Sequence, residues 1–141
     1  MTLSIQALGT VLLTPAPLDD APFYVAHFGF GPVAELEWYV SLQHPDLPHF
    51  FLDLMRADHP NVPEPLRAHA TAGLFLALGV AYAHAEARRL RLRAAGLSLL
   101  GEVTDEPWGQ RRFQVQGPGS VVVELAQRIA PDEAWIRANL G

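Results

Sequence analysis

Three polar side chains able to bind a ligand or move a proton fall close together in the last third of the sequence. Residues 110–116 and 121–126 read as two strands that are joined by a Gly-Pro-Gly turn. Because successive side chains of a strand point to opposite faces, Arg112 and Gln114 lie on one face of the first strand and Glu124 on the matching face of the second. We therefore expect Arg112 and Glu124 to share a cavity.

This pair allows two interpretations. The favoured one is structural, an ion pair in which each side chain satisfies the charge of the other. In the functional one, either group orients a polar ligand, and Glu124 is then the only candidate for a general base in an apolar site. The residues alone leave both open.

Composition excludes several other kinds of chemistry. The chain has 141 residues and no cysteine, so disulfides, thiolate catalysis, zinc ribbons and iron–sulfur clusters are ruled out. All ten basic residues are arginine, the net charge is -5 and only residues 88–93 are densely basic, so we expect no nucleic-acid partner. No apolar run reaches the roughly 20 residues that span a bilayer, and no signal peptide is recognisable, so we expect a cytoplasmic protein without a membrane partner.

The elements that must position these side chains repeat along the chain. In the first half, the helix is expected to start near Asp19 and Asp20, with Pro22 in its first turn and Gly29 at its end. The expected order is strand 5–14, this helix, and strands 33–37, 38–43 and 49–55. A proline-rich connector follows at 57–72, and then strand 74–80, a helix over 82–95 before Gly96, strands 97–103, 110–116 and 121–126, and a last helix within 131–141.

Two modules of one strand, one helix and three strands explain this order. We predict an α+β protein in which modules 5–56 and 73–126 form a curved mixed sheet with the helices outside. The whole chain, 1–141, is expected to be one domain. The concave side of that sheet, which we call the cup, would hold the site.

Specific motifs support this architecture. The segments Glu106-Pro-Trp-Gly-Gln-Arg-Arg-Phe113, Gly117-Pro-Gly-Ser120 and Val123-Glu-Leu125 resemble the vicinal oxygen chelate superfamily of glyoxalases, bleomycin-resistance proteins and extradiol dioxygenases. Phe23-Tyr24 and Phe28-Gly29-Phe30 are similar to the family's helix end. The family's Asp-Pro-x-Gly-Asn hairpin reads Gln-Gly-Pro-Gly-Ser here, which keeps its turn chemistry. The resemblance implies the two-module fold and a homodimer.

The resemblance also implies where a metal would bind. Metal-dependent members use four His, Gln or Glu side chains, and the matching positions here hold Phe51, Phe75 as the best match within 73–78, and Glu124, while the first strand offers only Gln6 and Thr10. Phenylalanine cannot bind a metal, and one carboxylate does not make a divalent site, so we expect no metal cofactor. If Mn, Fe, Ni or Zn is bound after all, Asp53 is the most plausible substitute ligand.

The lost ligands leave an apolar cup. Pockets for small organic molecules are typically apolar with few polar anchors, although ordinary core packing is the favoured role for each aromatic taken singly. The predicted ligand-binding residues are Trp38, Phe51, Asp53, Phe75, Trp108, Arg112, Gln114 and Glu124.

Two classes of function follow from the resemblance. The first is a metal-free protein that binds a small organic ligand, as the drug-sequestering bleomycin-resistance branch does, without catalysis. The second is a metal-dependent glyoxalase-like lyase or isomerase, or a dioxygenase. Since the fold does not settle the function, the choice depends on the site, and the missing ligands favour the binding protein.

Overall fold

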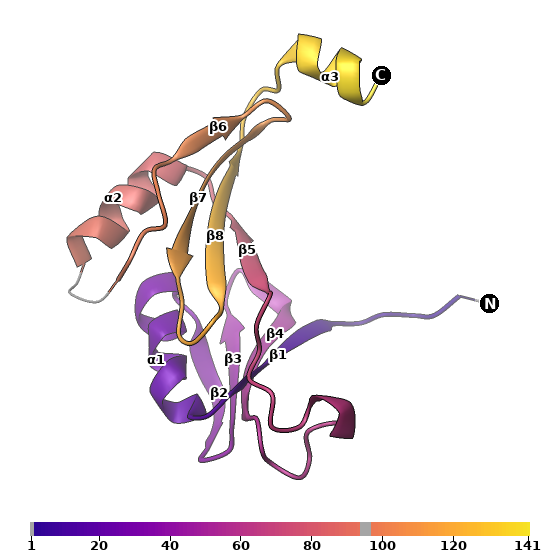
Figure 1. Cartoon of the computed structure of the whole chain (residues 1–141), viewed down its shortest axis with the longest axis vertical. Coiled ribbons are helices and arrows are strands. Elements are labelled where there is room, and N and C mark those ends of the chain that lie inside the picture. Colours follow the sequence, from indigo (N-terminus) through magenta and orange to yellow (C-terminus); the bar gives the residue numbers. More distant parts are fainter. Residues whose placement is uncertain (1, 94–96) are drawn as a thin grey trace. The chain divides into compact units, whose positions relative to one another are not determined.

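The computed structural model describes residues 2–93 and 97–141. The chain divides into two compact units, unit 1 (1–72) and unit 2 (73–141). Each unit begins with one strand, one helix and three further strands, which form a four-stranded mixed sheet, and a further helix follows in unit 2 (Figure 1). The predicted α+β fold of two βαβββ modules is confirmed.

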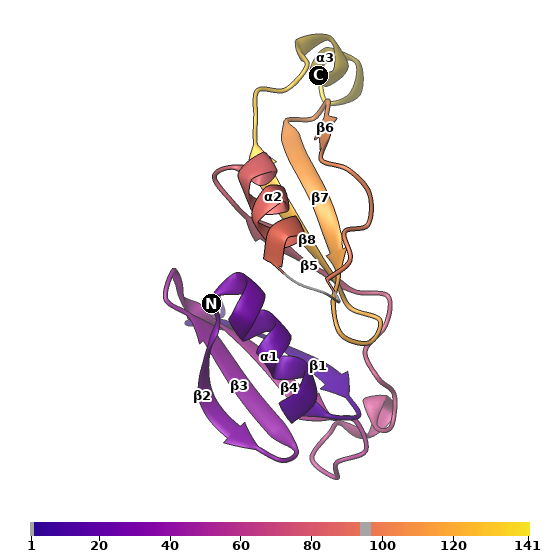
Figure 2. The ribbon, with the colours of Figure 1, turned by 90° about the vertical axis from the view of Figure 1, so that its left-hand side faces the viewer.

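Unit 1 places α1 across one face of its sheet (Figure 2). The strands lie in the order β1-β4-β3-β2, with β1 parallel to β4 and the other pairs antiparallel. Alternate strand residues such as Leu42, Leu52 and Leu54 are buried with Tyr24 of the helix. The elements are β1 (Leu8–Thr14), α1 (Pro17–Phe28), β2 (Gly31–Leu36), β3 (Tyr39–His44) and β4 (Leu47–Arg56).

The first helix begins earlier than the sequence analysis expects. Its first residue is Pro17, and Pro22 lies inside the helix instead of in its first turn. Proline fits the first helical position because the amide there has no intrahelical partner. The end is as predicted, since Gly29 closes the helix in the left-handed conformation, with a φ of 80°.

Unit 2 repeats this arrangement with strand order β5-β8-β7-β6. Its helix contributes Ala83, Ala87 and Leu90, which recur on one face and are buried with Phe113 and Val115 of β7. The elements are β5 (Phe75–Gly79), α2 (Ala83–Arg93), β6 (Thr104–Glu106), β7 (Gln110–Gln116), β8 (Val122–Arg128) and α3 (Glu133–Asn139). A short 3₁₀ helix (Glu64–Leu66) lies in the connector, which belongs to unit 1. The predicted Gly96 helix end lies outside the described residues.

The expected strand at 97–103 is wrong in position. Only Leu99 forms a bridge there, to Val115, and the strand that pairs along β7 is β6 instead. Gly101 has a φ of 102°, which extended strands do not adopt, so the backbone leaves the sheet before it returns. None of the helices in the described ranges is long and apolar enough to span a membrane.

Candidate functional site

The strands β7 and β8 bring the predicted polar side chains together. In their antiparallel register Gln114 lies directly opposite Glu124, and Arg112 lies two residues before Gln114 on β7. Phe113 and Val115 are buried, on the opposite face from Arg112 and Gln114. The period-two prediction for these two strands therefore agrees with the structure.

Glu124 is held by two donors. The Arg112 Nη1 donates to Glu124 Oε1 at 2.7 Å, and the Gln114 Nε2 donates to the same oxygen at 2.8 Å. The side chain of Glu124 is only 6% exposed, whereas that of Arg112 is 30% exposed. The hydrogen bond to Glu124 raises the pKa of the Arg112 guanidinium, which stays charged. The ion pair thus compensates a buried carboxylate.

A pocket of about 390 Å³ opens beside this ion pair. Its volume falls in the range of small-molecule sites, roughly 300–1,000 Å³. The apolar wall includes Phe75, which is 58% exposed and available to a ligand. The pocket is lined by Gly73, Leu74, Phe75, Arg112, Gln114, Ser120, Val122 and Glu124. All of these residues belong to unit 2.

Trp108 contacts Arg112, one of the residues that line the pocket. The guanidinium carbon of Arg112 lies 5.5 Å from the centre of the Trp108 ring, within the range of a cation–π contact. The indole also donates to Gln110 Oε1 at 2.9 Å and packs against Trp135 of α3, with ring centres 5.9 Å apart. Glu106 approaches the Arg112 Nε at 3.4 Å. Arg112 is therefore held from several sides.

Unit 1 carries the other predicted residues. Asp53 of β4 accepts hydrogen bonds from the Tyr39 hydroxyl and, at 2.7 Å, from the Ser41 hydroxyl. Phe51 lies two residues away on the same face of the strand, opposite Gly9 of β1. Tyr39 and Ser41 were not predicted, although their alternation along β3 could have identified them.

The structure places Trp38 against the connector. Its ring stacks on His59, with ring centres 3.8 Å apart and planes 9° from parallel. It also packs against a cluster of buried residues formed by Leu13, Met55, Ala57 and Val62. Trp38 thus has the packing role that the sequence analysis favours for each aromatic taken singly.

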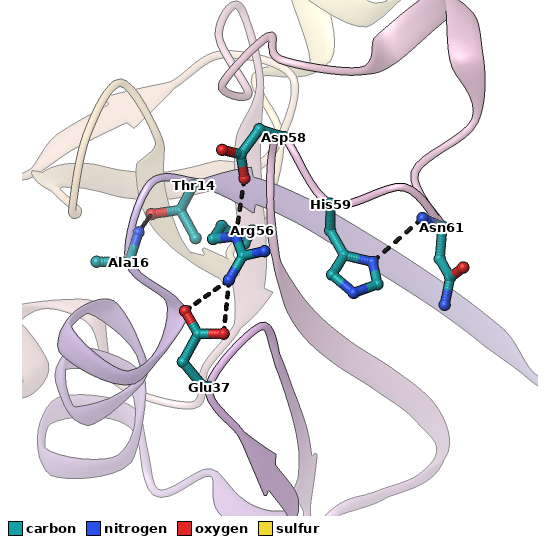
Figure 3. Close-up of polar contacts among 7 residues, drawn as sticks. All are labelled: Thr14, Ala16, Glu37, Arg56, Asp58, His59 and Asn61. Carbon is teal, nitrogen blue, oxygen red and sulfur yellow. Dashed lines mark hydrogen bonds and ion pairs between the residues drawn. The ribbon is translucent and has the colours of Figure 1, made fainter.

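Arg56 fixes the start of the connector, a feature the sequence analysis missed. Its Nη1 binds both carboxylate oxygens of Glu37, at 2.6 and 2.5 Å, and its Nε donates to Asp58 at 2.8 Å (Figure 3). His59 Nδ1 accepts from the Asn61 amide at 3.1 Å. These contacts are structural, since each charge is already paired.

Five of the eight predicted site residues therefore lie in unit 2 and three in unit 1. Within unit 2, Phe75, Arg112, Gln114 and Glu124 line one pocket, and Trp108 contacts Arg112. A common cup that joins both groups remains a prediction. Across residues 2–93 and 97–141, no group of three or more His, Asp or Glu side chains is placed to hold a metal ion.

Solved structures with this fold come from several bacteria. A glyoxalase/bleomycin resistance protein/dioxygenase from Nocardioides is 19% identical, with a TM-score of 0.72 over 92% of this chain and 85% of that one. TnmS3, an antibiotic binding protein from Streptomyces sp. CB03234, is 21% identical, with a TM-score of 0.62 over 91% and 98%. The bleomycin-binding protein of Streptomyces verticillus, complexed with copper(II)-bleomycin, is 17% identical, with a TM-score of 0.57 over 89% and 97%.

The sequence itself gives the family. No curated protein matches the chain. The sequence profile of the Glyoxalase/Bleomycin resistance protein/Dioxygenase superfamily matches residues 16–125, which include both helices and most strands of the two βαβββ units. The chain therefore belongs to the Glyoxalase/Bleomycin resistance protein/Dioxygenase superfamily.

Proposed function

We propose that this protein binds a small organic ligand in the unit 2 pocket, without a metal ion and without catalysis. The observation that carries this proposal is the Arg112–Glu124 ion pair at the edge of an apolar pocket. The ion pair supplies directional polar groups, while Phe75 and Val122 supply apolar surface. A few polar anchors among apolar walls are typical of small-molecule sites.

The donor set supports a metal-free site. Glu124 is the one acidic residue that lines the pocket, and its Oε1 already accepts hydrogen bonds from Arg112 and Gln114. A cation at this carboxylate would meet the positive charge of Arg112 at close range. Phe75 lies at a position where the family resemblance implies a metal-binding side chain, and phenylalanine has no donor atom for a metal. These residues do not fit a divalent metal centre.

Two structural neighbours suggest the kind of ligand. One is an antibiotic binding protein and the other binds bleomycin. We infer that a drug-like molecule with an aromatic portion stacks on Phe75 and forms hydrogen bonds with the ion pair. As the family resemblance implies, the working form is a homodimer.

A binding test with matched variants can decide this proposal. Bleomycin and a panel of small aromatic amides are added to chelator-treated protein, and the melting temperature is recorded. A ligand at 100 times its Kd adds about 2.7 kcal/mol of stability, which raises the melting temperature by several degrees. Phe75→Ala should weaken binding about tenfold, and Tyr82→Ala, which removes an aromatic ring that is 72% exposed in the same unit, should not.

Two results would overturn the proposal. In one, no compound of the panel raises the melting temperature. In the other, every stabilising compound binds Phe75→Ala as tightly as the unchanged protein, because the ligand then does not use the pocket.

A further inference from the structure

The two units place a carboxylate at equivalent positions of their sheets. Asp53 lies opposite Ser41 in the β3–β4 ladder, as Glu124 lies opposite Gln114 in the β7–β8 ladder. In each unit a second donor stands two residues away from the first on the same strand, Tyr39 in unit 1 and Arg112 in unit 2. The fold therefore presents a carboxylate at this position of each sheet, half-buried in unit 1 and buried in unit 2.

The donors differ in charge. Glu124 is paired with the cationic Arg112, whereas the donors to Asp53 in the described part of the chain are the neutral hydroxyls of Tyr39 and Ser41. Among the described residues, no Arg or His nitrogen forms an ion pair within 4.0 Å of the Asp53 carboxylate, and Arg56 of the same strand is paired with Glu37 and Asp58. Asp53 thus lies half-buried with no cationic partner among the described residues.

Apolar groups surround this charge. Val11 of β1 lies opposite Asp53 in the parallel β1–β4 ladder and is 47% exposed. Phe51 and the Tyr39 ring lie on the same face, with Phe51 two residues from Asp53 along β4. α1 packs on the opposite face, where Leu52 and Leu54 are buried. A negative charge beside two aromatic rings is the arrangement that attracts an organic cation.

We propose that this face of unit 1 is a binding site for a protonated amine on an aromatic or apolar body. The ammonium group would donate to the Asp53 carboxylate in a charge-assisted hydrogen bond, and the apolar body would cover Val11 and Phe51. Each carboxylate oxygen already accepts one hydrogen bond from a hydroxyl group. That leaves room for an N–H donor but supplies too few oxygen ligands for a divalent cation. All of the residues that carry this proposal belong to unit 1, so the argument does not rest on the unit 2 pocket.

The test is a nuclear magnetic resonance titration of the full ¹⁵N-labelled chain, because amide shifts report which unit binds. The probe is phenethylammonium, and its neutral analogue is 2-phenylethanol. We expect saturable shifts at the amides of β1, β3 and β4 around Asp53 with the ammonium, and at least tenfold weaker binding of the alcohol. Asp53→Asn should weaken ammonium binding at least tenfold.

Two control variants separate binding at Asp53 from attraction to the acidic chain in general. Asp58→Asn removes an exposed carboxylate of the same unit and should leave ammonium binding unchanged. Glu124→Gln, which changes the unit 2 pocket, should also leave ammonium binding unchanged. A negative result for the Asp53 site can therefore be told apart from a negative result for the unit 2 pocket. The inference is overturned if the ammonium gives no saturable shifts near Asp53, if Asp53→Asn binds it equally well, or if Mn²⁺ at equimolar concentration broadens these amides and displaces the ammonium.

Discussion

At the scale of single residues, the ion pair of unit 2 determines what its pocket can bind. Glu124 is compensated by Arg112, so the pocket presents a fixed dipole instead of a net charge. Breaking such a pair leaves one partner unpaired, which is costly when that partner is buried. The stability of the ion pair is therefore the first property to measure.

Removal of Arg112 should destabilise the protein because Glu124 would then keep only Gln114 as a donor. We expect Arg112→Met to cost roughly 1–3 kcal/mol, since the guanidinium is partly exposed and its charge partly screened. The double variant Arg112→Met/Glu124→Gln should recover part of that loss. Urea unfolding of the unchanged protein, the two single variants Arg112→Met and Glu124→Gln, and the double variant measures the coupling energy between the two side chains. Strictly additive losses of unfolding free energy would contradict the pairing.

Tyr39 should ionise late in the alkaline range. Burial, followed by its hydrogen bond to the negative Asp53, raises the pKa of the Tyr39 phenol from 10.0 to about 12. Because the folded state favours the neutral phenol, this contribution to stability is complete below about pH 10 and is lost as the pH rises toward 12.

The phenolate absorbance in the ultraviolet measures this ionisation. Asp53→Asn should lower the pKa of Tyr39, whereas Asp46→Asn, which removes an exposed carboxylate of the β3–β4 turn, should not. A Tyr39 titration that is the same in the Asp53→Asn variant would contradict the hydrogen bond between them.

At the scale of elements, the β6–β7 turn positions both Trp108 and Arg112. Gly109 in this turn has a φ of 107°, and a Cβ there would lie 3.0 Å from the Ile129 carbonyl oxygen. Only glycine fits both the conformation and the space. The same turn is tied to the residue that follows β8, since the Ile129 amide donates to the Gly109 carbonyl at 2.9 Å.

Gly109→Ala should therefore destabilise the protein by about 1–3 kcal/mol, through backbone strain and the close contact. Gly79→Ala in β5 is the matched control, because a Cβ there meets nothing within 4 Å and the backbone is not left-handed. Thermal unfolding compares the two variants. Equal effects of both substitutions would show that the turn does not need glycine.

The elements also show what the sequence could predict. The period-two pattern of residues 110–116 and 121–126 correctly placed Arg112, Gln114 and Glu124 on one face, because one face of each strand is buried against α2. The strand expected at 97–103 was wrong, since local apolar content does not reveal that Gly101 turns the backbone away. The asymmetry between Asp53 and Glu124 was also missed, because donors on a neighbouring strand depend on the register.

At the scale of the whole molecule, two units of the same topology carry different sites. Unit 2 has an apolar pocket beside a carboxylate paired with Arg112, and unit 1 has a half-buried carboxylate held by two hydroxyl groups. A ligand that carries both an aromatic group and an amine would have a partner of suitable chemistry in each unit. The proposed function thus rests on residues of unit 2 and the further inference on residues of unit 1.

Homodimerisation is a prediction from the family resemblance. The edge strand β1 exposes Leu8 (66%), an apolar side chain that a second subunit could cover. Size-exclusion chromatography with light scattering should give twice the 15.5 kDa of the chain. A mass of one chain at micromolar concentration would contradict the prediction.

The most direct test of the metal-free pocket is calorimetric titration of chelator-treated protein with Mn²⁺, Fe²⁺, Ni²⁺ and Zn²⁺, beside the Glu124→Gln variant. Our account predicts no saturable binding of any of these ions that depends on Glu124, because its carboxylate is already engaged by Arg112 and Gln114. Binding of one ion per chain that Glu124→Gln abolishes would contradict the account and identify Glu124 as a metal ligand.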